Sequence, residues 1–179
     1  PIEAASMARA APLWVGGRKA AAASMPLFAG RETPVLFDDT RPTIIANDLH
    51  TPAIDASREN AVRAGMQDHL LMMHGHFEDL TVERMTRAAH KDPPPNWPDE
   101  PSFEQGLIVC NPPYGERLET DLEELYFGLR DWAEGFGSGW RAAFLVADRE
   151  LIDIFGRPPR LEKPLHNGPI RSRLLVFDL

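Results

Sequence analysis

The sequence predicts an α/β fold with a mostly parallel sheet, and two observations support this. Short apolar segments alternate along the chain with segments that have helical spacing. Strands that alternate with helices give a mostly parallel sheet with helices on both faces. The last residues, 161–179, contain two strand-like segments joined by the turn Asn167-Gly168-Pro169, which predicts an antiparallel hairpin at one edge of that sheet.

Local signals predict the individual elements. Residues 1–10 are rich in alanine and begin with Pro1, and proline is best tolerated in the first turn of a helix. Thr51 followed by Pro52 predicts the cap and first turn of another helix, which Gly65 ends in a left-handed conformation. In chain order we expect a helix over 2–10, a strand over 43–46, a helix over 51–65, a strand over 70–73, a helix over 78–89, a strand over 106–110, a helix over 120–136, a strand over 142–147, a short helix to 155 and the hairpin.

The most regular helix is predicted after residue 120, where Thr120 and Glu123 have the spacing of a capping box. Asp148 is expected to cap the short helix that ends at Phe155. Residues 135–139 are rich in glycine, but they follow a helix and precede a strand, so they predict a helix end and not a phosphate loop. One face of the long helix is apolar at helical spacing: Leu122, Leu125, Tyr126, Leu129, Trp132, Ala133 and Phe136.

Two stretches carry less information. Residues 11–42 are interrupted by glycine and proline and predict no regular order of elements. Residues 91–101 contain the run Pro93-Pro94-Pro95, which predicts an extended surface connection.

The composition favours one domain in a reducing cytoplasm. The 179 residues fit a single domain, and 43% hydrophobic residues are enough to form a core. With 27 acidic and 19 basic residues the net charge is −8, so a nucleic acid would have to be held mainly by another module. The single cysteine, Cys110, is expected to be a buried apolar residue. No apolar run approaches the length that spans a membrane, and the sequence does not indicate an oligomeric state.

A rigid elbow follows the strand over 106–110. Asn111 comes directly after the apolar run, and Pro112 and Pro113 then stop any sheet ladder and restrict the backbone. In open α/β sheets, ligands bind at the carboxyl ends of the strands. The Asn111 amide and the Tyr114 ring could contact a flat base with an exocyclic amine, or the segment could be only a stiff loop.

Asp48 ends the strand over 43–46 in the same way. A carboxylate at this place could accept hydrogen bonds from both hydroxyls of a ribose, or it could only cap the following turn. His74 and His76 have no third ligand at a suitable spacing, so the sequence predicts no metal site.

The longer motif that starts with Asn111, Asn-Pro-Pro-Tyr-Gly-Glu-Arg-Leu, resembles the catalytic loop of S-adenosylmethionine-dependent amino-methyltransferases. It is most similar to the branch that modifies guanine N2 in 23S ribosomal RNA or in tRNA and that carries an N-terminal THUMP domain. Residues 1–5, 47–65 and 167–170 resemble other parts of that family in the same order. The resemblance implies a Rossmann-like class I methyltransferase sheet with an antiparallel C-terminal hairpin.

The resemblance also implies roles for individual residues. Asp48 would hold the ribose of S-adenosylmethionine, and Leu49 would lie against its adenine. Asn111 and the Pro112 carbonyl would accept hydrogen bonds from the target amine, which places its nitrogen in line with the methyl group. Tyr114 would stack on the base after it leaves its own stack.

Two departures from the family pattern affect these expectations. The family's glycine-rich loop and central strand, which the resemblance places just before Pro1, are not in the sequence. Residues 1–179 are therefore expected to be part of a catalytic domain, without its first strand and without the RNA-binding domain that precedes it. We expect that this part does not fold alone, because unpaired sheet edges would remain. Where the family usually has an acid for the adenine amine, this chain has His76, with Glu78 and Asp79 just beyond.

Three functions stay open at this point. The first is methyl transfer to the exocyclic amine of a base in RNA, with guanine as the first candidate for the base. The second is a DNA adenine-N6 methyltransferase, because such enzymes share the four-residue loop. The third is a non-catalytic, methyltransferase-like binding module, which the missing cofactor loop and the acidic charge favour.

Overall fold

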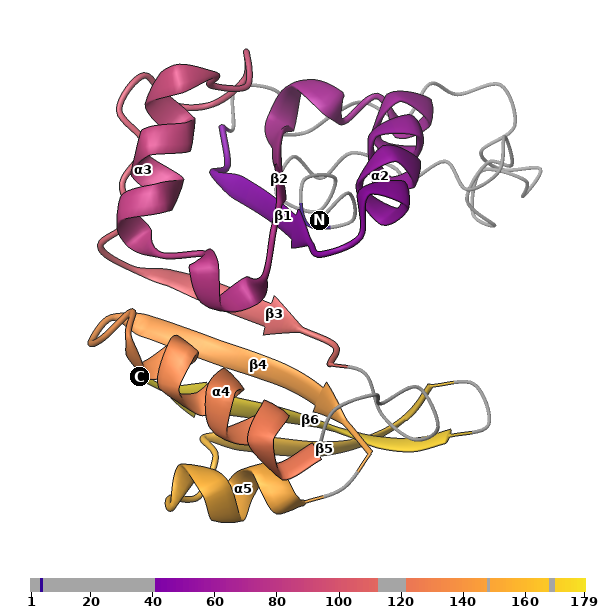
Figure 1. Cartoon of the computed structure of the whole chain (residues 1–179), viewed down its shortest axis with the longest axis vertical. Helices are drawn as coiled ribbons and strands as arrows, with labels where there is room; N and C mark the ends of the chain where they lie inside the picture. The colour runs from indigo at the N-terminus through magenta and orange to yellow at the C-terminus, as the bar shows by residue number, and fades with distance from the viewer. Residues whose placement is uncertain (1–3, 5–40, 113–121, 148, 168–169) are drawn as a thin grey trace, which may run out of the picture. The chain divides into compact units, whose positions relative to one another are not determined.

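The structure, a computed structural model, describes residue 4 and residues 41–112, 122–147, 149–167 and 170–179. The chain divides into two compact units, residues 1–101 and 102–179 (Figure 1). The described strands form one sheet of two strands and another of four. The helix expected over residues 2–10 lies outside the described residues except for Ala4, which is helical.

The first unit has a pair of parallel strands with helices on both faces. The strands β1 (Ile44–Asp48) and β2 (Leu70–His74) pair in register so that Asp48 lies opposite His74. Figure 1 shows α2 and α3 on opposite sides of this pair. The helical elements of the unit are α2 (Thr51–Ala64), η3 (Gln67–His69), η4 (Phe77–Asp79) and α3 (Val82–Lys91).

The ends of α2 and α3 correct two expectations. The cap of α2 is His50 and not Thr51, because residue 50 has the extended backbone of a cap (φ −97°) and Thr51 is already helical. The expected helix over 78–89 is instead the single turn η4 followed by α3, because the Thr81 hydroxyl accepts a hydrogen bond from the Arg84 N–H and caps a new helix there. Gly65 ends α2 in the left-handed conformation (φ 66°), as predicted.

The proline-rich segment is not only a surface connection. Trp97 is 2% exposed, and its indole N–H donates to the His69 carbonyl at 2.9 Å. The Asn96 N–H donates to the Asp68 carbonyl at 2.9 Å, and Pro94 is buried. The segment is therefore attached to η3 and the start of β2 through a buried aromatic ring, a contact that proline content alone does not predict.

The second unit has a four-stranded mixed sheet in the order β3-β4-β6-β5. The strands β3 and β4 are parallel, and β6 is antiparallel to both of its neighbours. The predicted hairpin is confirmed, but its antiparallel strand lies inside the sheet, because β6 also pairs with β4. The elements are β3 (Gly106–Cys110), α4 (Leu122–Glu134), β4 (Trp140–Val146), α5 (Glu150–Phe155), β5 (Leu161–Asn167) and β6 (Ile170–Asp178).

The helices α4 and α5 cover one face of this sheet (Figure 1). The predicted apolar face of α4 is confirmed, since Tyr126, Leu129 and Ala133 are at most 1% exposed. The Phe155 ring of α5 stacks on Phe177 of β6 with centroids 3.9 Å apart. The cap of α5 is Arg149, while the expected caps Asp148 and Thr120 lie outside the described residues.

The strand β3 is buried on one side only. Ile108 is 8% exposed, whereas Leu107 and Val109, which point to the other face, are 58% and 74% exposed. Glycine is needed at residue 106 because the Trp140 ring lies against it, and a Cβ there would come 2.6 Å from that ring. The predicted strand is therefore confirmed, and the face that carries Leu107 and Val109 is exposed.

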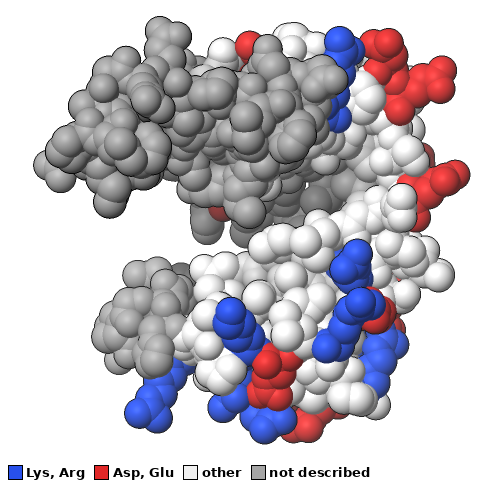
Figure 2. Space-filling model, turned by 180° about the vertical axis from the view of Figure 1, so that it is seen from behind, with Lys and Arg blue, Asp and Glu red and all other residues white. Residues whose placement is uncertain are grey.

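Charges of both signs are mixed on the surface of the second unit, in the lower part of Figure 2. Glu162 pairs with both Arg149 and Arg173, and Arg160 pairs with Asp178. These arginines are therefore partly neutralised by neighbouring carboxylates. Within the described residues, no helix is both long and apolar enough to cross a membrane.

Candidate functional site

The carboxyl end of β1 carries the first two predicted residues, Asp48 and Leu49. Asp48 is half-buried, and its Oδ1 accepts the His50 N–H at 2.8 Å. This hydrogen bond closes the turn after β1, which is the alternative role of Asp48, but it uses only one of the two carboxylate oxygens. Among the described residues, no hydrogen bond is made to Oδ2. Leu49 is 52% exposed, so an apolar side chain and a carboxylate oxygen are accessible side by side.

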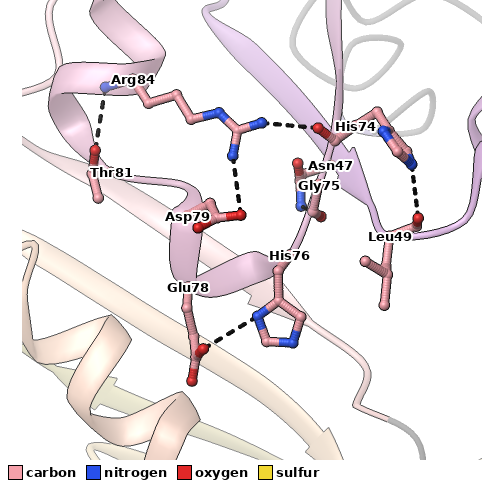
Figure 3. A network of polar contacts seen from close by, with 9 residues as sticks. All are labelled: Asn47, Leu49, His74, Gly75, His76, Glu78, Asp79, Thr81 and Arg84. Atoms are coloured by element: carbon pink, nitrogen blue, oxygen red, sulfur yellow. Dashed lines mark hydrogen bonds and ion pairs between the residues drawn. The ribbon is translucent and has the colours of Figure 1, made fainter.

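The carboxyl end of β2 is locked to that of β1. The Gly75 N–H donates to the Asp48 carbonyl at 3.1 Å, and the Asn47 amide donates to the Gly75 carbonyl at 2.9 Å. The His74 Nε2 lies 2.8 Å from the Leu49 carbonyl, and because a carbonyl only accepts, the ring donates (Figure 3). His74 is thus a structural link between the two strand ends.

The turn after β2 is further fixed by an arginine of α3 (Figure 3). Arg84 donates to the His74 carbonyl at 2.8 Å and lies 3.7 Å from a carboxylate oxygen of Asp79. Its guanidinium also packs on Gly75, where a Cβ would come 2.8 Å from a guanidinium nitrogen. Arg84 was not predicted from the sequence, because a contact across ten residues leaves no local signal.

His76, in the same turn, has an acidic side chain as its partner. Its Nδ1 lies 3.3 Å from a Glu78 carboxylate oxygen, and its ring packs on Phe77 with centroids 4.6 Å apart. The side chain is 45% exposed. Within the described residues, no group of three or more His, Cys, Asp or Glu residues could hold a metal ion.

The carboxyl end of β3 carries Asn111 and Pro112. Asn111 is exposed and Pro112 is buried, so the elbow stands on a packed proline. Pro113 and Tyr114 lie outside the described residues.

Cys110, the residue before Asn111, is half-buried, and not fully buried as expected. Burial raises the pKa of the Cys110 thiol to about 11, although the residue as a whole is only half-buried. The thiolate is the nucleophilic form, so the raised pKa lowers the nucleophilicity of this side chain near neutral pH.

A separate groove lies away from these strand ends. It has a volume of about 390 Å³ and none of its lining residues comes from the carboxyl end of β1 or β2. It is lined by parts of α2, η3, β2 and the proline run, among them Arg58, Val62, Gln67, Leu71, Asp92 and Pro94.

The chemistry of the β1 and β2 ends fits a nucleoside. Asp48 Oδ2 can accept from hydroxyl groups, and exposed Leu49 can contact the face of a flat base. Asn47 Oδ1 is a buried acceptor that has no hydrogen-bond partner among the described residues, and such an atom gains from a donor. These groups belong to the first unit, and Asn111 and Pro112 belong to the second.

Comparison with known proteins identifies the family. Residues 96–175 match the family described as RMKL-like, methyltransferase domain. The ribosomal RNA large subunit methyltransferase K/L of Syntrophotalea carbinolica is 39% identical over 141 residues, which are 77% of this chain and 18% of that protein. The protein of the same name from Hydrogenovibrio crunogenus is 29% identical over 140 residues, 77% of this chain and 17% of that protein.

A solved structure supports the fold. The crystal structure of the methyltransferase-like protein SMU.472, complexed with SAH, superposes with a TM-score of 0.62 at 22% identity, over 79% of this chain and 33% of that chain. At this identity the likeness shows the fold alone, and it confirms the predicted Rossmann-like class I sheet. The chain spans less than a fifth of the length of the two relatives above. It belongs to the family of RMKL-like methyltransferase domains, the THUMP-associated amino-methyltransferase group that its Asn-Pro-Pro-Tyr motif predicts.

Proposed function

We propose that the protein that carries this chain transfers a methyl group from S-adenosylmethionine to the exocyclic amine of a base in RNA, most specifically guanine N2 of 23S ribosomal RNA. The observation that carries the proposal is the exposed Asn111 amide, fixed by buried Pro112 at the carboxyl end of β3. The names of the relatives support ribosomal RNA as the substrate.

The Asn111 elbow would position the amine that accepts the methyl group. S-adenosylmethionine supplies an electrophilic methyl group on its sulfonium. The Asn111 side-chain oxygen and the Pro112 carbonyl accept hydrogen bonds from the amine, which orients the nitrogen toward that methyl group. An amide cannot protonate the amine, so the nitrogen lone pair stays available and the displaced proton passes to solvent. Pro113 would stiffen the elbow and Tyr114 would stack on the base.

The β1 end would hold the cofactor. Asp48 keeps one carboxylate oxygen for the ribose while the other fixes the turn at His50. Leu49 would lie against the adenine. The turn and ribose roles of Asp48 are thus compatible, because they use different oxygens.

The RNA would be gripped mainly by a domain outside this chain, in the cytoplasm. A net charge of −8 is unsuited to binding a polyanion, and arginines such as Arg160 and Arg173 are paired with acids. The chain described above would then carry out the methyl transfer, and the other domain would supply most of the affinity for RNA.

The test uses the full-length natural protein, isotopically labelled S-adenosylmethionine, and total RNA or total DNA. We expect label in RNA as N2-methylguanine after digestion to nucleosides. Label in DNA as N6-methyladenine would replace the proposal with the adenine methyltransferase. Calorimetry that shows no binding of either the cofactor or S-adenosylhomocysteine would favour a non-catalytic module.

A further inference from the structure

The segment over residues 157–173 differs in charge from the rest of the chain. It contains one acidic residue, Glu162, and five basic residues: Arg157, Arg160, Lys163, Arg171 and Arg173. A basic segment therefore lies in a chain whose net charge is −8. Most of this segment forms β5 and the start of β6, so the place of that hairpin determines what the charge can reach.

The outer end of the hairpin lies at the sheet edge that carries Asn111. The strand β6 pairs with β4 as far as Arg173, which lies opposite Val146, the last residue of β4. Residues 170–172 of β6 pair with β5 alone, and both hairpin strands extend past the arrowhead of β4 (Figure 1). Because β3 and β4 are parallel, Asn111 follows β3 at this same edge. β6 is two strand spacings, about 10 Å, from β3.

Three arginines at this edge share one carboxylate. The Glu162 oxygens lie 2.8 Å from a guanidinium nitrogen of Arg173 and 3.1 Å from one of Arg149. Arg171 is exposed and forms no ion pair with another described residue. Arg171 and Arg173 are two residues apart on β6, so their side chains leave the same face of the strand. One acid among three guanidinium groups leaves an excess of positive charge, which attracts a polyanion.

We propose that Arg171, together with Arg149 and Arg173, binds phosphate groups of the RNA strand beside the base that Asn111 receives. This proposal rests on the proposed function and adds to it a contact for RNA within this chain. Guanidinium groups bind phosphate oxygens through paired hydrogen bonds, and phosphate contacts position a nucleic acid without reading its sequence. The hairpin would direct the strand toward the elbow, while most of the affinity comes from the other domain.

The first experiment compares Arg171→Ala with Arg141→Ala in the full-length protein. Arg141 is also exposed and forms no ion pair with another described residue, but it lies near the start of β4, at the opposite edge of the sheet. Both variants lose the same charge. The probe is an unmodified transcript of 23S ribosomal RNA, and methylation gives kcat and KM between about 50 and 200 mM salt.

The loss of a phosphate contact should appear in KM and in its salt dependence. We expect Arg171→Ala to raise the KM for RNA about fivefold, to lower kcat by less than about twofold, and to reduce the slope of log KM against log salt by about 1. Arg171→Lys keeps the charge and should restore most of the KM. Arg141→Ala should retain the KM and the slope of the wild type.

A second variant should strengthen the contact. Glu162→Gln removes the negative charge that Arg149 and Arg173 share, so the KM for RNA should fall about two- to threefold, a result that destabilisation of the protein cannot produce. Glu134→Gln makes the same change in net charge at an acid paired with Arg157, and it should retain the wild-type KM.

The outcomes separate this proposal from the proposed function. Equal KM values and salt slopes in Arg171→Ala and Arg141→Ala would overturn the hairpin contact, while methylation of the transcript by the wild type would leave the proposed function standing. A KM for Glu162→Gln no lower than that for Glu134→Gln would remove Arg149 and Arg173 from the contact. A wild type that does not methylate the transcript would refute the proposed function, and the hairpin contact with it.

Discussion

The strand ends that we assign to the cofactor and to the base are held in different ways. The β1 and β2 ends are joined by hydrogen bonds from Gly75, Asn47 and Arg84. At the β3 end, Asn111 is exposed and has no hydrogen bond to another described residue, and it stands on buried Pro112. Hydrogen bonds fix the first region, and the restricted backbone of proline fixes the second. We expect substitutions in the first to alter cofactor affinity and substitutions in the second to alter turnover.

The largest effect is expected from Asn111→Ala in the full-length protein. It removes the side chain that orients the amine, so turnover should fall by about 100-fold or more, while the Kd for S-adenosylhomocysteine stays within about twofold. Single-turnover methylation and calorimetry measure the two quantities. Gln105→Ala, an exposed amide at the other end of β3, is the control and should retain turnover. Normal turnover in Asn111→Ala would remove Asn111 from the mechanism.

Asp48→Asn tests the cofactor side of the comparison. The amide keeps an oxygen for the His50 N–H but loses the charge that strengthens hydrogen bonds to the ribose, so the cofactor Kd should rise about tenfold. Turnover at saturating cofactor should change little. Asp55→Asn, at an exposed ion pair with Arg58 on α2, is the control. A larger loss of turnover than of affinity would contradict the assignment of cofactor binding to the first region and turnover to the second.

Arg84→Ala asks whether hydrogen bonds fix the turn after β2. Loss of a charged donor to the His74 carbonyl should lower the free energy of unfolding by about 1–2 kcal/mol and weaken cofactor binding a few-fold. Hydrogen exchange at the amides of Gly75 and His76 should become faster. Arg87→Ala removes an exposed ion pair with Glu83 and should leave both unchanged. Equal behaviour of the two variants would show that the turn does not depend on Arg84.

The sequence was sufficient where the signal is local. The spacing of Leu122, Tyr126 and Leu129 located α4, and the turn before Ile170 located the hairpin. The motif at Asn111 indicated the family before any contact was known. Each of these signals lies within a few consecutive residues.

It was insufficient where the contact is distant in sequence. Trp97 packs against η3 from 28 residues away, and Arg84 reaches back ten residues to the end of β2. The exposure of Asn111 depends on what packs around β3, and not on the apolar residues before it. Burial of a side chain and pairing of a charge are set by tertiary packing, which composition and periodicity do not record.

The smallest effect concerns Cys110, at the base of the Asn111 elbow. Burial raises the pKa of its thiol to about 11 from the ordinary value of 9.0. The unfolded chain therefore loses the proton first as the pH rises, so the thiol's contribution to stability is complete below pH 9 and is lost between about pH 9 and pH 11. The loss should be of order 1 kcal/mol, since the residue is partly exposed.

Other groups also titrate in this range, so the measurement is a difference. Denaturant unfolding of the wild type and of Cys110→Ala should give free energies whose difference shifts between pH 9 and pH 11 and stays constant from pH 6 to pH 8. A thiol shielded in this way should also resist alkylation at pH 8 until the protein unfolds. Rapid alkylation of the folded protein would show that the β3 end opens on its own. The restricted backbone of Pro112 would then not be enough to fix the second region.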